Sequence, residues 1–350
     1  MRKQTFATGF FLFYFMLPLK TMAANFTSMY VFGDSLEDPG NVFNVTGGLV
    51  PQSPPYFKGR FSNGPNWVDY LGQDLGLSPV PVTCLPFLSP SQVPVTCLPF
   101  VSPSQGINFA FGGATTGNTN TIPIPGLPGL DQEIQAFKGL IPVADSNGLY
   151  VVYAGANDYL GGGETNPANP VSNLSAEITS LFNMGGRNFL IPNLPDLGNT
   201  PLGLSLGSAG SNGLNFLSAG HNIGLSNAID GLNKSLSGIN IIPVDVNGLV
   251  NEAIQGKLGF TNVTDSCLTN FNNQSLPDLD FNICDNPDTY LFWDNLHPTT
   301  AANRLVADAA LKAIEDNHKS VPEPSENWGI FAIAALGVGG MLKRSYSRRG

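Results

Sequence analysis

Short runs rich in β-forming residues constrain the fold of this 350-residue chain more than any other feature. These runs occupy residues 26–32, 149–153, 188–191 and 239–246. The run at 149–153, LYVVY, is apolar on both faces, which is typical of a strand buried inside a parallel sheet. Residues 170–182 and 300–316 repeat apolar side chains every three or four positions, as amphipathic helices do. Strands that alternate with helices predict an α/β domain with a central parallel sheet covered by helices on both faces.

Candidate catalytic residues lie near the two ends of this domain. Ser35 follows the first run through the tight Gly33-Asp34 step, which would hold its hydroxyl at the carboxyl end of the sheet, where open α/β proteins bind ligands. Late in the chain, Asp294 precedes His297 by three positions. An imidazole shuttles protons near neutral pH, and a carboxylate can fix its orientation. The three groups outline an acyl-transfer site, although taken singly Asp34 and Ser35 could cap a helix and Asp294 and His297 could form a surface pair.

Two further segments can supply donors for an oxyanion. Residues 108–115, NFAFGGAT, contain a glycine pair that lets backbone N–H groups approach a substrate closely. Residues 155–158, GAND, follow the buried run at 149–153, so Asn157 would project an amide from a strand end. Either segment could instead be an ordinary turn, since Gly-Gly and Asn-Asp pairs are common in turns.

The remaining histidines carry no chemical signal. His221 lies in a stretch rich in Gly and Asn, and His318 lies at the end of the last predicted helix, so we predict that both are exposed to solvent. Three scattered histidines and the lack of a Cys-x-x-Cys pair predict no metal site, and nothing in the sequence predicts another cofactor.

The strings GDSL, NFAFGGAT, GAND and DNLHP occur in this order, and together they resemble the GDSL or SGNH family of serine esterases and lipases. The strings FGDSLEDPGN, IPNLPDLGNTP, GFTNVTDSC and YLFWDNLHP resemble its secreted bacterial branch. The resemblance extends from about Tyr30 to Asp308, and it implies a flavodoxin-like three-layer α/β/α sandwich. It also implies a triad of Ser35, Asp294 and His297. The oxyanion donors that it implies are Ser35, Gly113 (with Gly112 as the alternative) and Asn157.

Both ends of the chain carry the pattern of targeting segments. Residues 1–24 combine a basic start, a short apolar core and small residues, which predicts a secretory signal peptide cleaved after Ala23 or Ala24. Residues 321–350 contain Pro-Glu-Pro, an apolar run at 328–342 and a basic cluster, and they resemble a PEP-CTERM sorting signal. That resemblance implies transient membrane anchoring and removal of the tail by an exosortase, whereas a plain C-terminal anchor is the alternative. One hydrolase domain, 25–320, lies between them.

A tandem duplication and four cysteines complete the pattern. Residues 80–92 and 93–105 agree at twelve of thirteen positions, and three prolines in each copy predict an elongated surface loop, with a lid over the site as the alternative. In an oxidising compartment we expect a disulfide between Cys267 and Cys284. Cys84 and Cys97 are copies of one residue, and they could pair or stay free.

The formal net charge of −10 would repel phosphate backbones, so nucleic acid is not a predicted partner. The sequence predicts an exported carboxylic ester hydrolase, extracellular or at the cell surface, that acts through an acyl-enzyme on acyl esters of lipid or of acylated polysaccharide. Two alternatives are an acyltransferase that uses the same site and a non-catalytic matrix or carbohydrate-binding protein.

Overall fold

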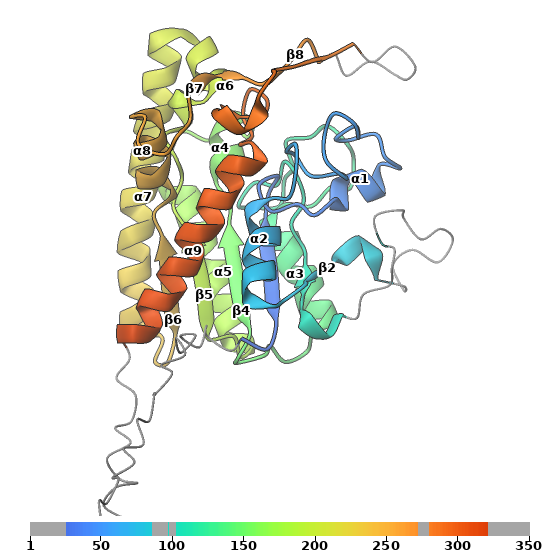
Figure 1. Ribbon diagram of the computed structural model, residues 1–350. Helices are drawn as coiled ribbons and strands as arrows, with labels where there is room; N and C mark the ends of the chain where they lie inside the picture. Colours follow the sequence, from blue (N-terminus) through green and yellow to red (C-terminus); the bar gives the residue numbers. More distant parts are fainter. Residues whose placement is uncertain (1–25, 86–96, 98–102, 272–279, 321–350) are drawn as a thin grey trace, which may run out of the picture.

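The computed structural model describes residues 26–85, 97, 103–271 and 280–320, and its centre is a six-stranded sheet with the order β2-β3-β1-β4-β5-β6 (Figure 1). Every pairing in this sheet is parallel. The strands are β1 (Met29–Gly33), β2 (Val80–Pro81), β3 (Ile107–Asn108), β4 (Leu149–Tyr153), β5 (Asn188–Pro192) and β6 (Asn240–Val244). The predicted α/β architecture around a central parallel sheet is confirmed.

Helices cover both faces of the sheet. They are α1 (Asn41–Val45), α2 (Trp67–Leu75), α3 (Leu130–Leu140), α4 (Ala156–Leu160), α5 (Ala168–Met184), α6 (Pro201–Ser205), α7 (Gly207–Ser235), α8 (Val246–Ile254) and α9 (Thr300–Ser320). Tyr150 and Val152 of β4 belong to the same buried cluster as the apolar faces of α3 and α5. Leu149 and Val151 belong to the cluster that α2 and α9 complete on the opposite face. Alternate side chains of β4 therefore point into two apolar layers, one on each face of the sheet. Helices, sheet and helices form the three-layer sandwich seen in Figure 1.

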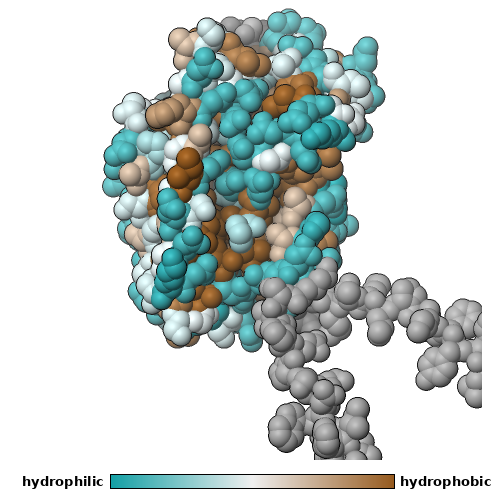
Figure 2. All heavy atoms as spheres, turned by 90° about the vertical axis from the view of Figure 1, so that its left-hand side faces the viewer, coloured by the Kyte–Doolittle hydropathy of each residue, from teal (hydrophilic) through white to brown (hydrophobic). Residues whose placement is uncertain are grey.

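Element boundaries differ from the predicted ones where capping residues intervene. The fourth apolar run ends as a strand at Val244 because Asp245 begins a helix there: its side chain accepts a hydrogen bond from the N–H of Gly248, and α8 follows. The sequence did not predict α7, a helix of 29 residues rich in Gly, Asn and Ser. On its outer side Phe216 and Ile223 are exposed, and apolar surface shows among hydrophilic surface on this side of the molecule (Figure 2).

The duplicated segment is not a loop throughout. Val80 and Pro81, at the start of the first copy, form the edge strand β2 and pair with β3. Proline is tolerated there because an edge strand leaves one row of N–H groups unused. Cys84 and Cys97, the equivalent residues of the two copies, form a disulfide. The predicted loop between and after them lies largely outside the described residues.

A small peripheral region precedes the late Asp-x-x-His segment. In it β7 (Asn262–Ser266) pairs with β10 (Tyr290–Phe292), and β8 (Leu268–Thr269) pairs with β9 (Asn282–Ile283). Cys267 and Cys284, the pair expected from the sequence, form a disulfide. The buried indole of Trp293 packs in the same cluster as this disulfide, so the residue before Asp294 is anchored to it.

The predicted signal peptide, 1–24, and the predicted sorting tail, 321–350, lie outside the described residues. Among the helices between residues 26 and 320 that the structure describes, none is both long and apolar enough to cross a bilayer.

Candidate active site

The turn after β1 places Ser35 at the carboxyl end of the sheet. This turn can form because Gly33 has no side chain. A Cβ at position 33 would lie 2.4 Å from the carbonyl oxygen of Tyr153 and 2.5 Å from Oε2 of Glu37, which is too close. The N–H groups of Glu37 and Asp38 donate to the carbonyl of Asp34, at 3.2 and 3.0 Å. The next helix, α1, begins only at Asn41, so Asp34 and Ser35 do not cap it.

His297 and Asp294 reach Ser35 from the other end of the chain. Nε2 of His297 lies 2.8 Å from Oγ of Ser35, and Nδ1 lies 2.7 Å from Oδ2 of Asp294. The N–H groups of Leu296 and His297 donate to Oδ1 of Asp294, at 2.8 and 2.7 Å, and hold this carboxylate in place. The structure therefore brings Ser35 together with a histidine 262 positions later in the chain and with the carboxylate beside it, in an unbroken line of hydrogen bonds.

The charges of this pair stabilise each other. Burial alone would lower the pKa of His297, but the charge and hydrogen bond of Asp294, together with the charge of Asp34, raise the pKa above its ordinary value. Burial would raise the pKa of Asp294, yet the charge of His297 and the hydrogen bonds from His297 and Tyr56 lower it. Asp294 is consequently a carboxylate at neutral pH, which is the form that can stabilise an imidazolium.

Tyr56 is a member of this site that the sequence did not indicate. Its hydroxyl donates to Oδ2 of Asp294 at 2.6 Å, so that one oxygen accepts from both the phenol and the imidazole. Burial and the nearby charge of Asp294 raise the pKa of Tyr56, which keeps the phenol protonated. No local pattern could have identified it, because the contact joins positions 238 residues apart.

In the glycine pair after β3, the N–H of one glycine has an acceptor and the N–H of the other has none among the described residues. The N–H of Gly112 donates to Oδ2 of the buried Asp38 at 2.8 Å. Gly113 adopts φ +80°, a left-handed conformation that favours glycine, and no described residue accepts a hydrogen bond from its N–H. The N–H of Ser35 also has no acceptor within the described part of the chain. The N–H groups of Ser35 and Gly113 are thus two backbone donors without an acceptor in the described part of the chain.

Asn157 follows β4 at the start of α4, and its amide is already in use. Nδ2 donates to Oδ2 of Asp34 and to the carbonyl of Ala114, both at 3.1 Å. The side chain therefore joins the serine turn to the glycine segment. It differs from the free donor that the sequence suggested, because either bond would have to be exchanged before this amide could serve an oxyanion.

Four buried carboxyl groups lie in the turn that carries Ser35 or next to it. They are Asp34, Glu37, Asp38 and Glu133. Glu133 of α3 accepts from the N–H of Gly33 at 2.9 Å through Oε2 and from the N–H of Phe111 at 3.0 Å through Oε1. Burial raises the pKa of all four, to about 6 for Asp34 and Asp38. The carboxyl of Glu133 thereby fixes the end of β1 relative to the glycine segment, a role that its place in a helical pattern did not reveal.

The prediction that His221 is exposed is wrong. This residue of α7 is 1% exposed, its Nδ1 lies 3.0 Å from the hydroxyl of Tyr159, and burial lowers its pKa to about 4. A Cβ at Gly155 would lie 2.7 Å from its ring, so the imidazole packs directly behind the turn that carries Asn157. The error has a physical origin, since α7 itself was not predicted. His318 is exposed, as expected.

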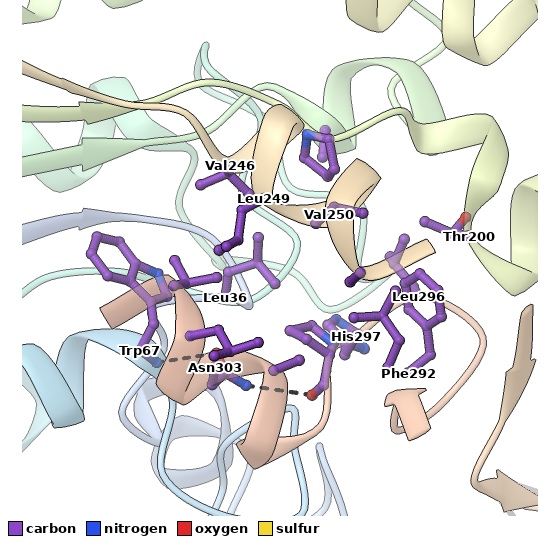
Figure 3. Close-up of a pocket in the computed structure, with 18 of the residues that line it drawn as sticks. Leu36, Trp67, Thr200, Val246, Leu249, Val250, Phe292, Leu296, His297 and Asn303 are labelled. Atoms are coloured by element: carbon purple, nitrogen blue, oxygen red, sulfur yellow. Dashed lines mark hydrogen bonds between the residues drawn. The ribbon is translucent and has the colours of Figure 1, made fainter. Parts of the chain in front are cut away.

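Two cavities of different character meet at His297. One lies between α8 and α9 and next to Ser35, with an almost wholly apolar lining and a volume of about 90 Å³ (Figure 3). The other, of about 420 Å³, lies beside Asp294 and has aromatic and polar walls that include Tyr56, Phe61 and Asn270. Within the described residues, no group of three or more His, Cys, Asp or Glu side chains is arranged to hold a metal ion.

The parallel fold, with polar side chains gathered at the carboxyl ends of its strands, places the chain in the class of α/β proteins that bind ligands at that edge of the sheet. The model of the family described as GDSL-like Lipase/Acylhydrolase matches residues 29–310. The chain belongs to this family and is a carboxylic ester hydrolase.

Its similarity extends over most of the domain. One GDSL esterase/lipase of Arabidopsis thaliana is 28% identical over 326 residues, which cover 81% of this chain and 81% of the relative. A second from the same plant is 26% identical over 329 residues, covering 81% and 83%. A solved carbohydrate acetylesterase family member from Sinorhizobium meliloti has a TM-score of 0.44 and 15% identity, covering 83% of this chain and 98% of that chain.

Proposed function

We propose that the protein hydrolyses esters through an acyl-enzyme on Ser35, with His297 as general base and acid and Asp294 as its orienting carboxylate. The observation that carries this proposal is the line of hydrogen bonds from Ser35 Oγ to His297 at 2.8 Å and on to Asp294 at 2.7 Å. In the first step Oγ bonds to the acyl carbon while its proton passes to Nε2. The bond to the alcohol then breaks, and Nε2 protonates the departing oxygen.

Deacylation repeats these steps with water. Nε2 takes a proton from water, the hydroxide oxygen bonds to the acyl carbon, and the acid leaves as Oγ recovers the proton. The oxyanion of each tetrahedral intermediate would be stabilised by the N–H groups of Ser35 and Gly113, which have no other acceptor among the described residues. Asn157 would be the third donor, exchanging its bond to Asp34 or to Ala114 for one to the oxyanion.

A fluorophosphonate probe and two serine variants test this assignment. We expect the wild-type protein to be labelled and the Ser35→Ala variant to lose both labelling and turnover, by a factor of about 10⁴ or more. Ser205→Ala, at an exposed serine of α6, is the matched control and should behave as the wild type. A folded protein that resists labelling and binds polysaccharide would instead favour the non-catalytic matrix or carbohydrate-binding alternative.

Acyl transfer by the same site is a second candidate function. The cavity beside Asp294 favours it, because an alcohol could bind there before water reaches the acyl-enzyme. Product partitioning measured with increasing concentrations of a sugar alcohol distinguishes the two functions. Hydrolysis predicts that free acid dominates at every concentration, whereas transfer predicts that the new ester dominates once the acceptor saturates.

We also propose that the protein is exported and acts on acyl esters of extracellular polysaccharide or lipid, with its tail processed by an exosortase-type enzyme. The two disulfides support an oxidising compartment. Mass spectrometry of the protein from its native host tests this: export predicts a mature N-terminus at Ala24 or Asn25, and tail processing predicts loss of residues 328–342. An intact chain recovered from the cell interior would contradict both.

A further inference from the structure

We propose that the two cavities divide the ester between them, with an acyl chain of medium length in the apolar cavity and a polyhydroxy alcohol of sugar size in the polar one. This assignment rests on the proposed function, since it takes Ser35 as the attacking group. The position of His297 motivates it. The imidazole lines both cavities, whereas Ser35 lines only the apolar one and Asp294 only the polar one.

The apolar cavity suits a hydrocarbon chain. Its walls come from the serine turn through Leu36, from α8 through Val246, Leu249 and Val250, and from α9 through Leu305 and Val306. In Figure 3 the α8 side chains lie opposite Leu36, and His297 lies at the end where Val250 and Leu296 approach it. A chain that enters beside Ser35 would therefore run between two helices and away from the imidazole.

The few polar side chains around this cavity are occupied by protein partners. Asn303 accepts from the N–H of Trp67 at 3.1 Å and donates to the carbonyl of Thr299 at 3.0 Å. Thr200 donates to the carbonyl of Leu197 at 2.7 Å. With these groups already paired, a polar substituent in the cavity would lose its water and gain little in return, whereas methylene groups lose nothing.

The size of the apolar cavity limits the chain length. A volume of about 90 Å³, on a scale where one water-sized group needs roughly 10–15 Å³, corresponds to about six to nine such groups. Counting the carbonyl carbon, the cavity is matched by acyl chains of about seven to ten carbons. Within that range each further buried methylene should raise kcat/KM by up to about fourfold, and beyond it the gain should stop.

The second cavity adjoins the imidazole on the side of Asp294. The leaving oxygen receives its proton from Nε2, which faces Ser35, so only the part of the alcohol beyond that oxygen would extend around the ring into this cavity. Phe61 lies 5.2 Å from the imidazole, ring centre to ring centre, and Tyr56 lies 5.6 Å from Phe271, so aromatic faces line the space. Such faces pack against the C–H surface of a sugar ring.

Polar groups in the same wall could bind the hydroxyls of that sugar. The side chains of Asn270 and Asn295 are exposed, and neither makes a hydrogen bond to another described residue. Each amide offers both donors and an acceptor, which matches the donor and acceptor character of a hydroxyl group. The cavity leaves more room for solvent-sized groups than the apolar one does, at about 420 against 90 Å³.

Filling each cavity separately tests the assignment. With nitrophenyl esters from acetyl to palmitoyl, we expect the wild-type kcat/KM to be highest between heptanoyl and decanoyl. Val250→Trp should lower the octanoyl value at least tenfold and change the acetyl value less than threefold, because only the longer chain needs the filled space. Glu252→Trp, on the exposed side of the same helix, is the matched control and should leave the profile unchanged. Fluorophosphonate labelling verifies that each variant has an intact site, and Leu249→Trp replaces any Val250 variant that is not labelled.

The polar cavity is tested by changing the alcohol instead. Thr269→Trp, at an exposed residue of its wall, should lower kcat/KM for octanoyl glucose at least fivefold and leave methyl octanoate unchanged. A wild-type optimum at acetyl, or a Val250→Trp variant with the wild-type length profile, would overturn the acyl assignment. Equal effects of Thr269→Trp on both octanoyl esters would overturn the alcohol assignment. Failure of the wild type to hydrolyse any ester or to take the label would overturn the proposed function itself.

Discussion

The two halves of the site are held in place by different means. Ser35 sits on the central sheet, and the turn that carries it rests on carboxyl groups buried inside the fold, among them Glu37 and Glu133. His297 sits at the periphery, where short strands, the Cys267–Cys284 disulfide and the phenol of Tyr56 position its turn. The serine side is therefore part of the core, whereas the imidazole side is attached to it.

Because of this difference, we expect substitutions on the two sides of the site to affect different properties, stability on one side and catalysis on the other. Changes beneath Ser35 expose unpaired N–H groups in the core and should lower the free energy of unfolding. Changes around His297 leave the sheet intact, so they should act mainly on the alignment and protonation of the imidazole.

The largest effect on activity is expected at the carboxylate that orients the imidazole. In Asp294→Asn the side chain can no longer hold His297 in the tautomer that accepts the serine proton, so kcat should fall by a factor of about 10⁴. Asp288→Asn, at an exposed aspartate of the same peripheral region, is the control and should keep wild-type kcat. Steady-state kinetics with one ester measures both. A loss below tenfold in Asp294→Asn would show that the carboxylate is not essential to the mechanism.

The largest effect on stability is expected beneath the serine turn. Glu133→Ala would leave the N–H of Gly33 without an acceptor, at about 1–3 kcal/mol. The N–H of Phe111 would keep only its bond to the carbonyl of Gly33 at 3.3 Å, and losing the bond to Glu133 should cost about 0.5–1.5 kcal/mol. We therefore expect the free energy of unfolding to fall by about 1.5–4.5 kcal/mol in urea titrations. Glu133→Gln keeps one carbonyl acceptor and should lose roughly half as much. If the alanine variant unfolds at the wild-type midpoint, the carboxyl does not support the core as argued.

Removing each of the two disulfides in turn compares the imidazole side of the site with a region away from it. Their sequence separations are similar, 17 and 13 residues, so removing either by Cys→Ser changes should cost about 3 kcal/mol of unfolding free energy. Only the Cys267–Cys284 bond anchors the turn of Asp294, whereas the Cys84–Cys97 bond follows the edge strand β2. We expect kcat/KM at 25 °C to fall several-fold in the first double variant and to stay unchanged in the second. Equal activity in both would mean that the disulfide does not position the imidazole.

The sequence predicted the parts of this site that are marked by local patterns. The apolar run at 149–153 coincides with β4, and Ser35 and Asn157 follow strand ends as the alternation implied. Tyr56 and Glu133 were missed because their roles depend on contacts with residues far away in the sequence. His221 was misjudged for a related reason: the Gly- and Asn-rich sequence of α7 has weak helical propensity, and tertiary packing overrides it.

The smallest predicted effect concerns the phenol that shares Oδ2 of Asp294 with the imidazole. Tyr56→Phe removes a competing donor, so the bond from Asp294 to His297 should strengthen and the pKa of His297 should rise further. Catalysis needs the neutral imidazole, so activity is lost as the pH falls through the pKa of His297, which already lies above its ordinary value. The acidic limb of the pH profile of kcat/KM should therefore move to higher pH in Tyr56→Phe. The plateau at high pH should change less than threefold, because the triad geometry survives. A limb that moves to lower pH would show that the phenol raises the pKa of the imidazole instead of restraining it.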